Sequence, residues 1–189
     1  MSPADGSAFV SRGGEKLSAA LDHFSLDPTG LVCADLGSHV GGFVDCLLAR
    51  GACKVYSVDT SYGTLAWKLR KDERVVVIER QNAMHVELPE PVDLVTIDVG
   101  WTPQQKILPS ARRLLSPNGR VVTLIKPHYE ASKNTLDGGV LPDESIEGVL
   151  QGVSASMVDD GWTVLGSVRS PIRGHGGNTE FLALLQRTR

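Results

Sequence analysis

A glycine-rich turn follows a short apolar run near the start of the chain and reads Asp35-Leu36-Gly37-Ser38-His39-Val40-Gly41-Gly42-Phe43. The apolar run, residues 31–36, has the profile of a buried parallel strand. Gly37 permits a tight turn, and the two adjacent glycines let backbone amides at the start of a helix approach a ligand closely. The turn therefore predicts a strand, a ligand site and a helix, in that order.

Apolar runs and helical spacings alternate along the rest of the sequence. Strands are expected at residues 31–36, 54–59, 75–79, 92–98, 120–125, 162–168 and 180–186, and helices at 14–24, 42–50, 61–71, 103–115 and 144–160. A turn is predicted at 116–119, and loops at 128–140 and 170–178. Strands separated by helices indicate an α/β fold, in which a mostly parallel sheet carries helices on both faces.

Length and composition suggest one domain in the cytoplasm. A chain of 189 residues with 41% hydrophobic residues is long enough for one well-buried core and short for two domains. We expect residues 1–10 to form a flexible start and residues 11–189 to form the domain. No apolar run is long enough for a membrane helix, and the first ten residues lack the pattern of a secretory signal, so a cytoplasmic protein is expected.

The charge balance limits the choice of partner. A net charge of −3 argues against the broadly basic surface that binds nucleic acid through its phosphates, so RNA is a candidate partner only through a local basic patch. No histidine pair or carboxylate cluster has the spacing of metal ligands, and no metal site is expected. Cys33, Cys46 and Cys53 form no C-x-x-C pair and are expected to be buried free thiols.

Polar residues at the ends of the first three strands suit a nucleoside, since ligands of open parallel sheets bind beyond the carboxyl ends of the strands. Asp35 suits a ligand with an ammonium group, and the turn after it is not G-x-G-x-x-G, which disfavours a dinucleotide. Asp59 could accept hydrogen bonds from both ribose hydroxyls, and Asn82 could bond an adenine edge. Each residue alone fits ordinary loop chemistry, and only their joint register favours a nucleoside site.

Four charged residues lie at strand or helix ends and could face one cleft: Lys16, Asp98, Lys126 and Glu180. Methyl transfer to a ribose hydroxyl needs the hydroxyl proton removed. An uncharged lysine could be the base, or ammonium groups could stabilise the developing alkoxide, with the carboxylates orienting both amines. The alternative is a pair of solvated salt bridges. It fits Lys126 least, because this lysine directly ends an apolar strand.

Five ordered motifs carry a resemblance to a known family. They are Ser11-Arg12-Gly13-Gly14-Glu15-Lys16-Leu17, the turn at 35–43, Thr96-Ile97-Asp98-Val99, Ile125-Lys126-Pro127-His128-Tyr129-Glu130 and Asn178-Thr179-Glu180-Phe181-Leu182. Together they resemble the FtsJ-like ribose methyltransferases, and most of all their hemolysin-A-like (TlyA) branch. The similarity runs from about Phe9 to Leu185, nearly the whole chain.

The resemblance implies a Rossmann-like class I methyltransferase fold, with a seven-stranded, mostly parallel sheet and an antiparallel last strand. It also implies S-adenosylmethionine as the cofactor and RNA, including ribosomal RNA, as the partner methylated at a ribose 2'-hydroxyl. The Lys-Asp-Lys-Glu tetrad of the family falls on Lys16, Asp98, Lys126 and Glu180, and we choose Lys126 as the base. The expected cofactor-binding residues are Asp35, Gly37, Ser38, His39, Gly41, Gly42, Phe43, Asp59, Thr60, Asn82, Ala83 and Asp98.

The sequence departs from the family pattern in two places and in its length. His39 and Val40 stand where the family usually has small residues, threonine or proline, and Gly100-Trp101 replaces a Ser-Phe pair. TlyA-like proteins carry an amino-terminal S4-type RNA-binding domain, which we expect this chain to lack. Two other functions stay open: a methyltransferase of the same fold with a small-molecule or other non-RNA acceptor, and a non-catalytic cofactor-binding protein.

Several aromatic and basic residues have weaker indications. Trp101 would stack on a base or, as is more common, pack against a neighbouring helix. Of Tyr62 and Trp67, one is expected near the adenosine and the other in the core. Residues that could contact phosphate, with a solvated surface role as the alternative, are Arg12, Lys133, Arg169, Arg173 and His175.

Overall fold

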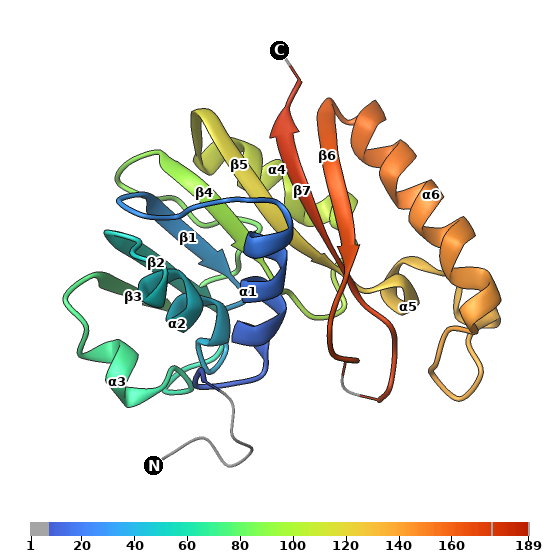
Figure 1. Cartoon of the computed structure of the whole chain (residues 1–189), viewed down its shortest axis with the longest axis horizontal. Coiled ribbons are helices and arrows are strands. Elements are labelled where there is room, and N and C mark those ends of the chain that lie inside the picture. Colours follow the sequence, from blue (N-terminus) through green and yellow to red (C-terminus); the bar gives the residue numbers. More distant parts are fainter. Residues whose placement is uncertain (1–7, 175, 189) are drawn as a thin grey trace.

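The computed structural model describes residues 8–174 and 176–188, which form one seven-stranded sheet with the order β3-β2-β1-β4-β5-β7-β6 and helices packed on it (Figure 1). The strands are β1 (Val32–Leu36), β2 (Lys54–Asp59), β3 (Val75–Glu79), β4 (Val92–Ile97), β5 (Leu115–Ile125), β6 (Trp162–Arg169) and β7 (Phe181–Arg187). The helices are α1 (Gly13–His23), α2 (Gly42–Ala49), α3 (Trp67–Arg70), α4 (Gln104–Leu114), α5 (Pro127–Glu130), the 3₁₀ turn η1 (Lys133–Thr135) and α6 (Asp143–Asp159). The predicted α/β fold is confirmed.

The strand directions also agree with the resemblance. Strands β1 to β5 run parallel, and β7 lies antiparallel between β5 and β6. Ile125 of β5 pairs with Phe181 of β7. The residues just outside this pair, Lys126 and Glu180, therefore lie at the same edge of the sheet.

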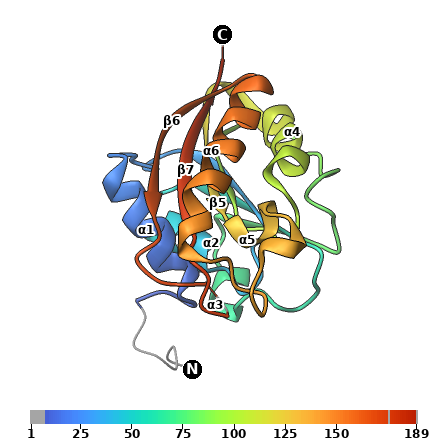
Figure 2. The ribbon, with the colours of Figure 1, turned by 90° about the vertical axis from the view of Figure 1, so that its right-hand side faces the viewer.

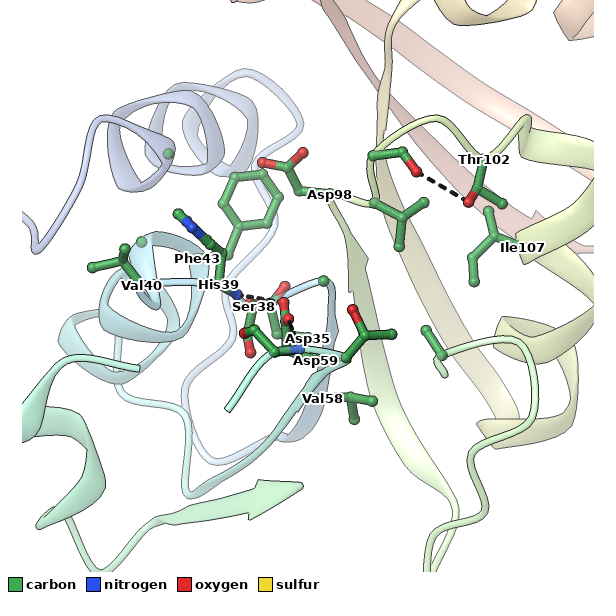
Figure 3. A pocket seen from close by; sticks show the side chains of 18 of the residues that line it. Asp35, Ser38, His39, Val40, Phe43, Val58, Asp59, Asp98, Thr102 and Ile107 are labelled. Carbon is green, nitrogen blue, oxygen red and sulfur yellow. Dashed lines mark hydrogen bonds between the residues drawn. The ribbon is translucent and has the colours of Figure 1, made fainter. Parts of the chain in front are cut away.

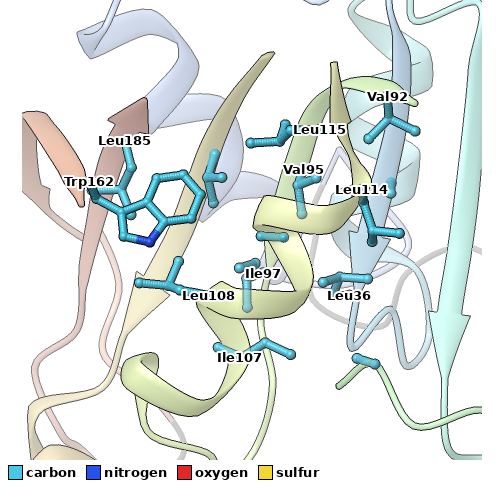
Figure 4. Packing of buried hydrophobic residues seen from close by; sticks show 14 of the residues in the cluster. Leu36, Val92, Val95, Ile97, Ile107, Leu108, Leu114, Leu115, Trp162 and Leu185 are labelled. Carbon is cyan, nitrogen blue, oxygen red and sulfur yellow. The ribbon is translucent and has the colours of Figure 1, made fainter. Parts of the chain in front are cut away.

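Each face of the sheet has its own hydrophobic core, because the side chains of a strand alternate between the two faces. On one face, Leu36, Val95 and Ile97 pack with residues of α4 and α6, and Figure 4 shows Ile107, Leu108 and Leu114 of α4 among them. On the other face, the core includes Leu94 and Val122 together with residues of α1 and α2. Figure 2 shows α1 and α4 on opposite sides of the sheet. Burial on both faces explains why these strands are continuous apolar runs in the sequence.

The helix predicted at 61–71 is mostly absent, since α3 has only the four residues Trp67–Arg70. The backbone N–H of Ser61 donates to Asp59 Oδ1 at 2.7 Å, and Gly63 has a φ of +74°, which lies outside helical geometry. The N–H of Gly63 donates to Glu79 Oε1 at 2.9 Å instead of to a helical carbonyl. Bonds from the backbone to nearby carboxylates compete with a helix here, so the prediction was wrong for residues 61–66.

Two predicted connections contain regular structure. Residues 116–119, expected as a turn, belong to β5, whose pairing with β4 shifts register at an irregularity next to them. The predicted loop at 128–140 contains most of α5, the η1 turn and an isolated β-bridge between Asp137 and Val140. Pairing with the neighbouring strand overrides the local preference of the turn residues at 116–119, whereas short-range backbone bonds form the structure within 128–140.

Expectations about the chain start, the thiols and the membrane have different outcomes. Residues 1–7 of the expected flexible start lie outside the described residues. The N–H of Val10, which belongs to the same expected segment, donates to Asp45 Oδ2 at 2.8 Å. The boundary between the flexible start and the domain stays a prediction. Cys33 and Cys46 are buried as predicted, but Cys53 is exposed. Within the described part of the chain, no helix is both long and apolar enough to cross a membrane.

Trp162 tests the packing of β6 and β7 onto the sheet. It is 1% exposed, lies near Leu108 and Leu185, and has the Arg112 guanidinium 4.7 Å above its ring (Figure 4). We expect Trp162→Ala to lower the free energy of unfolding in denaturant titrations by about 3–5 kcal/mol, because it leaves a large cavity. Leu165→Ala, in the same strand but 46% exposed, is the control and should cost much less. Equal losses for both variants would contradict this account of the core.

Candidate active site

A cavity of about 760 Å³ opens at the edge of the sheet where the parallel strands end. Its walls come from the loops after β1, β2, β3 and β4, from Lys126 after β5, and from the start of α1. Figure 3 shows Asp35, Asp59 and Asp98 at these neighbouring strand ends. Eleven of the twelve residues expected to bind a cofactor line this cavity: Asp35, Gly37, Ser38, His39, Gly42, Phe43, Asp59, Thr60, Asn82, Ala83 and Asp98.

The glycines of the turn have different roles. Gly37 has a φ of +88°, and a Cβ there would lie 2.5 Å from the carbonyl oxygen of Asp98. Gly41 has a φ of +100° and is not among the lining residues of the cavity; a Cβ there would overlap Leu65 and Leu69. Close packing against Leu65 and Leu69 thus explains why glycine is required at position 41. Glycine at position 37 instead allows the turn to pack against the backbone that follows β4.

Asp35 presents a buried carboxyl group to the cavity. The residue is 1% exposed, its Oδ1 accepts a hydrogen bond from the Thr96 hydroxyl at 2.7 Å, and its Oδ2 has no partner among the described residues. Burial raises the pKa of Asp35 to about 8, against the lowering effect of the Thr96 bond, and the charges of Asp98 and Asp59 add to the rise. A buried carboxyl with one free oxygen suits a cationic ligand group.

Asp59 has the opposite character. Its Oδ2 accepts the N–H of His39 at 2.8 Å, and its Oδ1 accepts the N–H of Ser61 at 2.7 Å. Burial alone would raise the pKa of Asp59, but the bonds from Ser61 and His39 outweigh it and the pKa lies below the ordinary value. His39 has a φ of +48°, which is uncommon for a residue with a side chain. The ionised carboxylate keeps further lone pairs for a pair of hydroxyl groups.

The remaining wall residues supply polar and apolar contacts. The hydroxyl groups of Ser38 and Ser57 lie 2.8 Å apart below the turn. Asn82 Oδ1 accepts the N–H of Met84 at 2.9 Å, so its side-chain NH₂ is the group that Asn82 offers to a ligand. Phe43 and Ala83 add apolar surface. The wall therefore combines hydrogen-bonding and apolar groups, as a nucleoside requires.

The four charged residues of the tetrad form two ion pairs. Lys126 Nζ lies 2.7 Å from Asp98 Oδ1 and also donates to the carbonyl oxygen of Val99 at 3.1 Å. Lys16 Nζ lies 2.5 Å from Glu180 Oε2. The four side chains are between 4% and 26% exposed, so neither pair is the solvated salt bridge that the sequence left open. Lys16, Asp98 and Lys126 line the cavity, and Glu180 reaches it through Lys16.

Two loops hold Glu180 in its buried place. Asn178, 4% exposed, accepts the N–H of Leu141 at 3.0 Å and donates to the carbonyl oxygen of Gly139 at 3.1 Å. Its own carbonyl accepts the N–H of Gly174 at 2.9 Å, and a Cβ at Gly174 would overlap the Glu180 carboxylate. The sequence placed Asn178 in the last motif without this role, which depends on contacts between distant loops.

The aromatic expectations were mostly wrong. Trp101 was expected to stack on a base or to pack against a neighbouring helix; it is 83% exposed at the rim of the cavity, with a φ of +52°, so most of its ring stays uncovered. Its ring centroid lies 6.3 Å from that of Tyr129. Tyr62 and Trp67 are 70% and 69% exposed, so neither is in the core, and neither lines the cavity.

The residues suggested for phosphate contact lie in different settings. Arg12 lines the cavity, and Lys133 is exposed in η1. Arg169 and Arg173 are exposed in and after β6, where they donate to Thr179 Oγ1 at 3.3 Å and to the carbonyl oxygen of Gly177 at 2.8 Å. His175 lies outside the described residues. A role of these groups in phosphate binding stays a prediction.

Some wall residues were not identified from the sequence. They are apolar or small residues of the strand ends and of α4, and include Val58, Met84, Thr102 and Ile107. Val58 directly precedes Asp59, and this position next to a predicted ligand residue was a usable signal. Ile107 lies four residues into a helix, and only the packing of α4 against the sheet brings it to the cavity.

The strand order, the antiparallel β7 and a cavity bounded by Asp35 and Asp59 define a class I methyltransferase fold. The chain belongs to the FtsJ-like methyltransferase family, whose model matches residues 9–187.

Relatives with known names support this assignment. The chain is 38% identical over 185 residues to the 16S/23S rRNA (cytidine-2'-O)-methyltransferase TlyA of Mycobacterium tuberculosis. The matched region covers 95% of this chain and 69% of TlyA. It is 40% identical over 183 residues to YqxC of Bacillus subtilis. This match covers 92% of this chain, but the chain spans only 64% of the length of YqxC, which is less than two thirds. A solved structure of a hemolysin-like protein from Streptococcus thermophilus has a TM-score of 0.93 at 39% identity, over 98% of this chain and 69% of that one.

Gly37→Ala tests the contact between the turn and Asp98. The new Cβ would strain a φ of +88° and push against the Asp98 carbonyl, so we expect a loss of about 2 kcal/mol or more in the free energy of unfolding. Gly100→Ala is the matched control, because nothing lies within 4 Å of a Cβ there. Denaturant titration measures both, and a Gly37→Ala protein as stable as the control would contradict the contact.

Proposed function

We propose that this protein is an S-adenosylmethionine-dependent methyltransferase that methylates a ribose 2'-hydroxyl of RNA. The observation that carries the proposal is the presence of two largely buried lysine–carboxylate pairs, whose side chains are 4% to 26% exposed, at the cavity that also contains Asp35 and Asp59. Buried ion pairs are costly to maintain and are weak devices for stability. A protein that only binds the cofactor would not require them, which argues against the non-catalytic alternative.

The residues of the cavity fit S-adenosylmethionine. The free Oδ2 of Asp35 would take its ammonium group, Asp59 the ribose hydroxyls and Asn82 the adenine edge. Gly37 and Gly42 leave room for close approach at the turn. When bound, the cofactor supplies a methyl group that is activated for transfer.

Lys126 is the proposed base. In its uncharged form, Nζ takes the proton of the ribose hydroxyl, while Asp98 and the Val99 carbonyl hold this nitrogen in position. Lys16, fixed by Glu180, supplies a second positive charge in the same cavity. This charge stabilises the developing alkoxide.

The choice of RNA as acceptor is supported by the rim of the cavity and by the relatives. The exposed ring of Trp101, near Tyr129, offers a stacking surface for a base beside Lys126. Arg12 in the wall offers a positive charge for a phosphate. Such local groups can hold RNA on a chain with a net charge of −3. The relative TlyA is named for methylation of ribosomal RNA, and the same acceptor would place this protein in the cytoplasm.

A small-molecule acceptor is the second candidate, because the net negative charge favours it over a polyanion. Incubation with methyl-labelled cofactor, in one reaction with total RNA and in another with a small-molecule extract, separates the two candidates. Label in the RNA supports the first candidate. Label in the extract together with unlabelled RNA supports the second.

Asp35 makes cofactor binding depend on pH. The carboxyl is protonated below about pH 8 in the free protein, and an ammonium ligand favours the charged form, so binding releases a proton. The affinity for S-adenosylhomocysteine should therefore rise with pH up to about pH 8, by at most tenfold per unit, and level off above it. Calorimetry measures the trend. Asp35→Asn should flatten it, and an unchanged slope in that variant would exclude Asp35 as the ammonium partner.

Lys126→Ala tests the base. Loss of a general base typically lowers the rate by about 100- to 10,000-fold, and we expect labelling of RNA to fall by this much while cofactor affinity is kept. Lys106→Ala, which removes an exposed lysine of α4, is the charge-matched control and should label RNA normally. Full labelling by the Lys126→Ala protein would refute the role given to this residue.

A further inference from the structure

Two exposed aromatic rings lie in the connection between β2 and β3, beside the cavity but outside it. Tyr62 and Trp67 are 70% and 69% exposed. Ser61, which precedes Tyr62, lines the cavity next to Asp59. Ala66, which precedes Trp67, donates its N–H at 3.0 Å to the carbonyl oxygen of Val40, another residue of the cavity wall. Both rings therefore adjoin the nucleoside end. Large aromatic rings that remain exposed beside a ligand cavity are available for contact with a binding partner.

Each ring has a cation on its face. The Arg80 guanidinium lies 4.2 Å from the centre of the Tyr62 ring, and Lys71 Nζ lies 5.0 Å from that of the Trp67 ring. Neither cation forms an ion pair with any carboxylate of the described chain. Three other cations of the same region are paired, since Lys68 bonds Asp45, Arg70 bonds Glu79 and Arg74 bonds Asp72. Lys71 and Arg80 are thus the positive charges that this surface leaves available.

The backbone fixes the Tyr62–Arg80 pair. Arg80 has a φ of +55°, and its N–H donates to the carbonyl oxygen of Ser61 at 3.2 Å, which joins the loops after β2 and β3. The N–H of Gly63 adds a second link to Glu79 at 2.9 Å. A positive φ is uncommon for a residue with a side chain, and here backbone bonds between the two loops accompany it. This backbone conformation places the charged group against a ring at the surface.

We propose that Tyr62, Trp67, Lys71 and Arg80 form a ring–cation surface that binds a single-stranded segment of the RNA acceptor, away from the methylated nucleotide. Rings that stack on bases and cations that contact phosphates together hold single strands with little sequence preference. In the sheet, β1 and β4 separate β2 from β5, which ends one residue before Lys126, so the bound segment lies on the opposite side of the cavity from the proposed base. The inference rests on the proposed function, because it needs an RNA acceptor.

Titration of a fluorescein-labelled, unstructured single-stranded RNA tests the surface. The double variant Tyr62→Ala, Arg80→Asn removes the ring and the charge, and asparagine tolerates the positive φ. We expect its RNA affinity to fall about tenfold or more and the slope of log affinity against log salt to decrease by about 0.7 for the lost phosphate contact. Its affinity for S-adenosylhomocysteine and its melting temperature should stay unchanged. Trp67→Ala, Lys71→Ala should weaken RNA binding in the same direction.

The double variant Arg120→Ala, Leu165→Ala is the control, because it removes an exposed cation and an exposed apolar side chain elsewhere. An RNA affinity of the Tyr62/Arg80 variant equal to that of the control would overturn the surface. An equal loss of cofactor affinity would also overturn it, since the residues would then belong to the cofactor site. If RNA binding depends on the surface but no methyl group is transferred to RNA, the proposed function is refuted and the surface is not. If methyl transfer occurs and the Tyr62/Arg80 variant has an unchanged KM for RNA, the surface is refuted and the proposed function is not.

Discussion

The contact between Gly37 and the backbone of Asp98 is the constraint on which the site depends. The two residues follow β1 and β4, which are neighbours in the sheet, and the N–H of Asp98 donates to the carbonyl oxygen of Leu36 at 3.0 Å. A side chain at Gly37 would fill the space that the Asp98 carbonyl occupies. Because glycine allows this approach, the turn that would hold a cofactor and the carboxylate that holds Lys126 lie side by side.

A second close contact brings the other ion pair to the same place. Gly42 at the start of α2 lies against the start of α1, where a Cβ on Gly42 would come within 2.9 Å of the Gly14 nitrogen. This packing fixes Lys16 over the end of the sheet, and the antiparallel β7 supplies Glu180 from the other side. Residues from four separate motifs therefore line one cavity, and the fifth motif contacts it through the bond of Glu180 to Lys16, although the chain between the first and the last motif spans most of its length.

The sequence predicted this site well wherever a polar residue directly ends an apolar strand. Asp35, Asp59, Asp98 and Lys126 were identifiable because the carboxyl ends of parallel strands must share one edge. Glu180 was assigned from the family motif, and its burial depends on Asn178 and on loops far apart in the sequence. Strand bounds were predicted closely except for the start of β5, since burial on both faces leaves continuous apolar runs.

The incorrect predictions, of a helix at 61–66 and of covered aromatic rings, both concern residues whose conformation or exposure depends on contacts that local sequence does not show. The segment 61–66 has a helical pattern, but bonds to Asp59 and Glu79 hold it in another conformation. The aromatic residues Tyr62, Trp67 and Trp101 were expected to be at least partly covered, because burial usually stabilises large rings, and the structure leaves all three in water. Local sequence does not reveal that Trp101 lies at the rim of a cavity and that Tyr62 and Trp67 lie outside both the cavity and the core.

A crystal structure with S-adenosylhomocysteine would show whether the cavity is the cofactor site. We expect the ligand's ammonium group at Asp35 Oδ2, its ribose hydroxyls at the Asp59 carboxylate and its sulfur at the end of the cavity near Asp98 and Lys126. A ligand bound away from this cavity, or bound in it with the sulfur far from Lys126, would contradict the account.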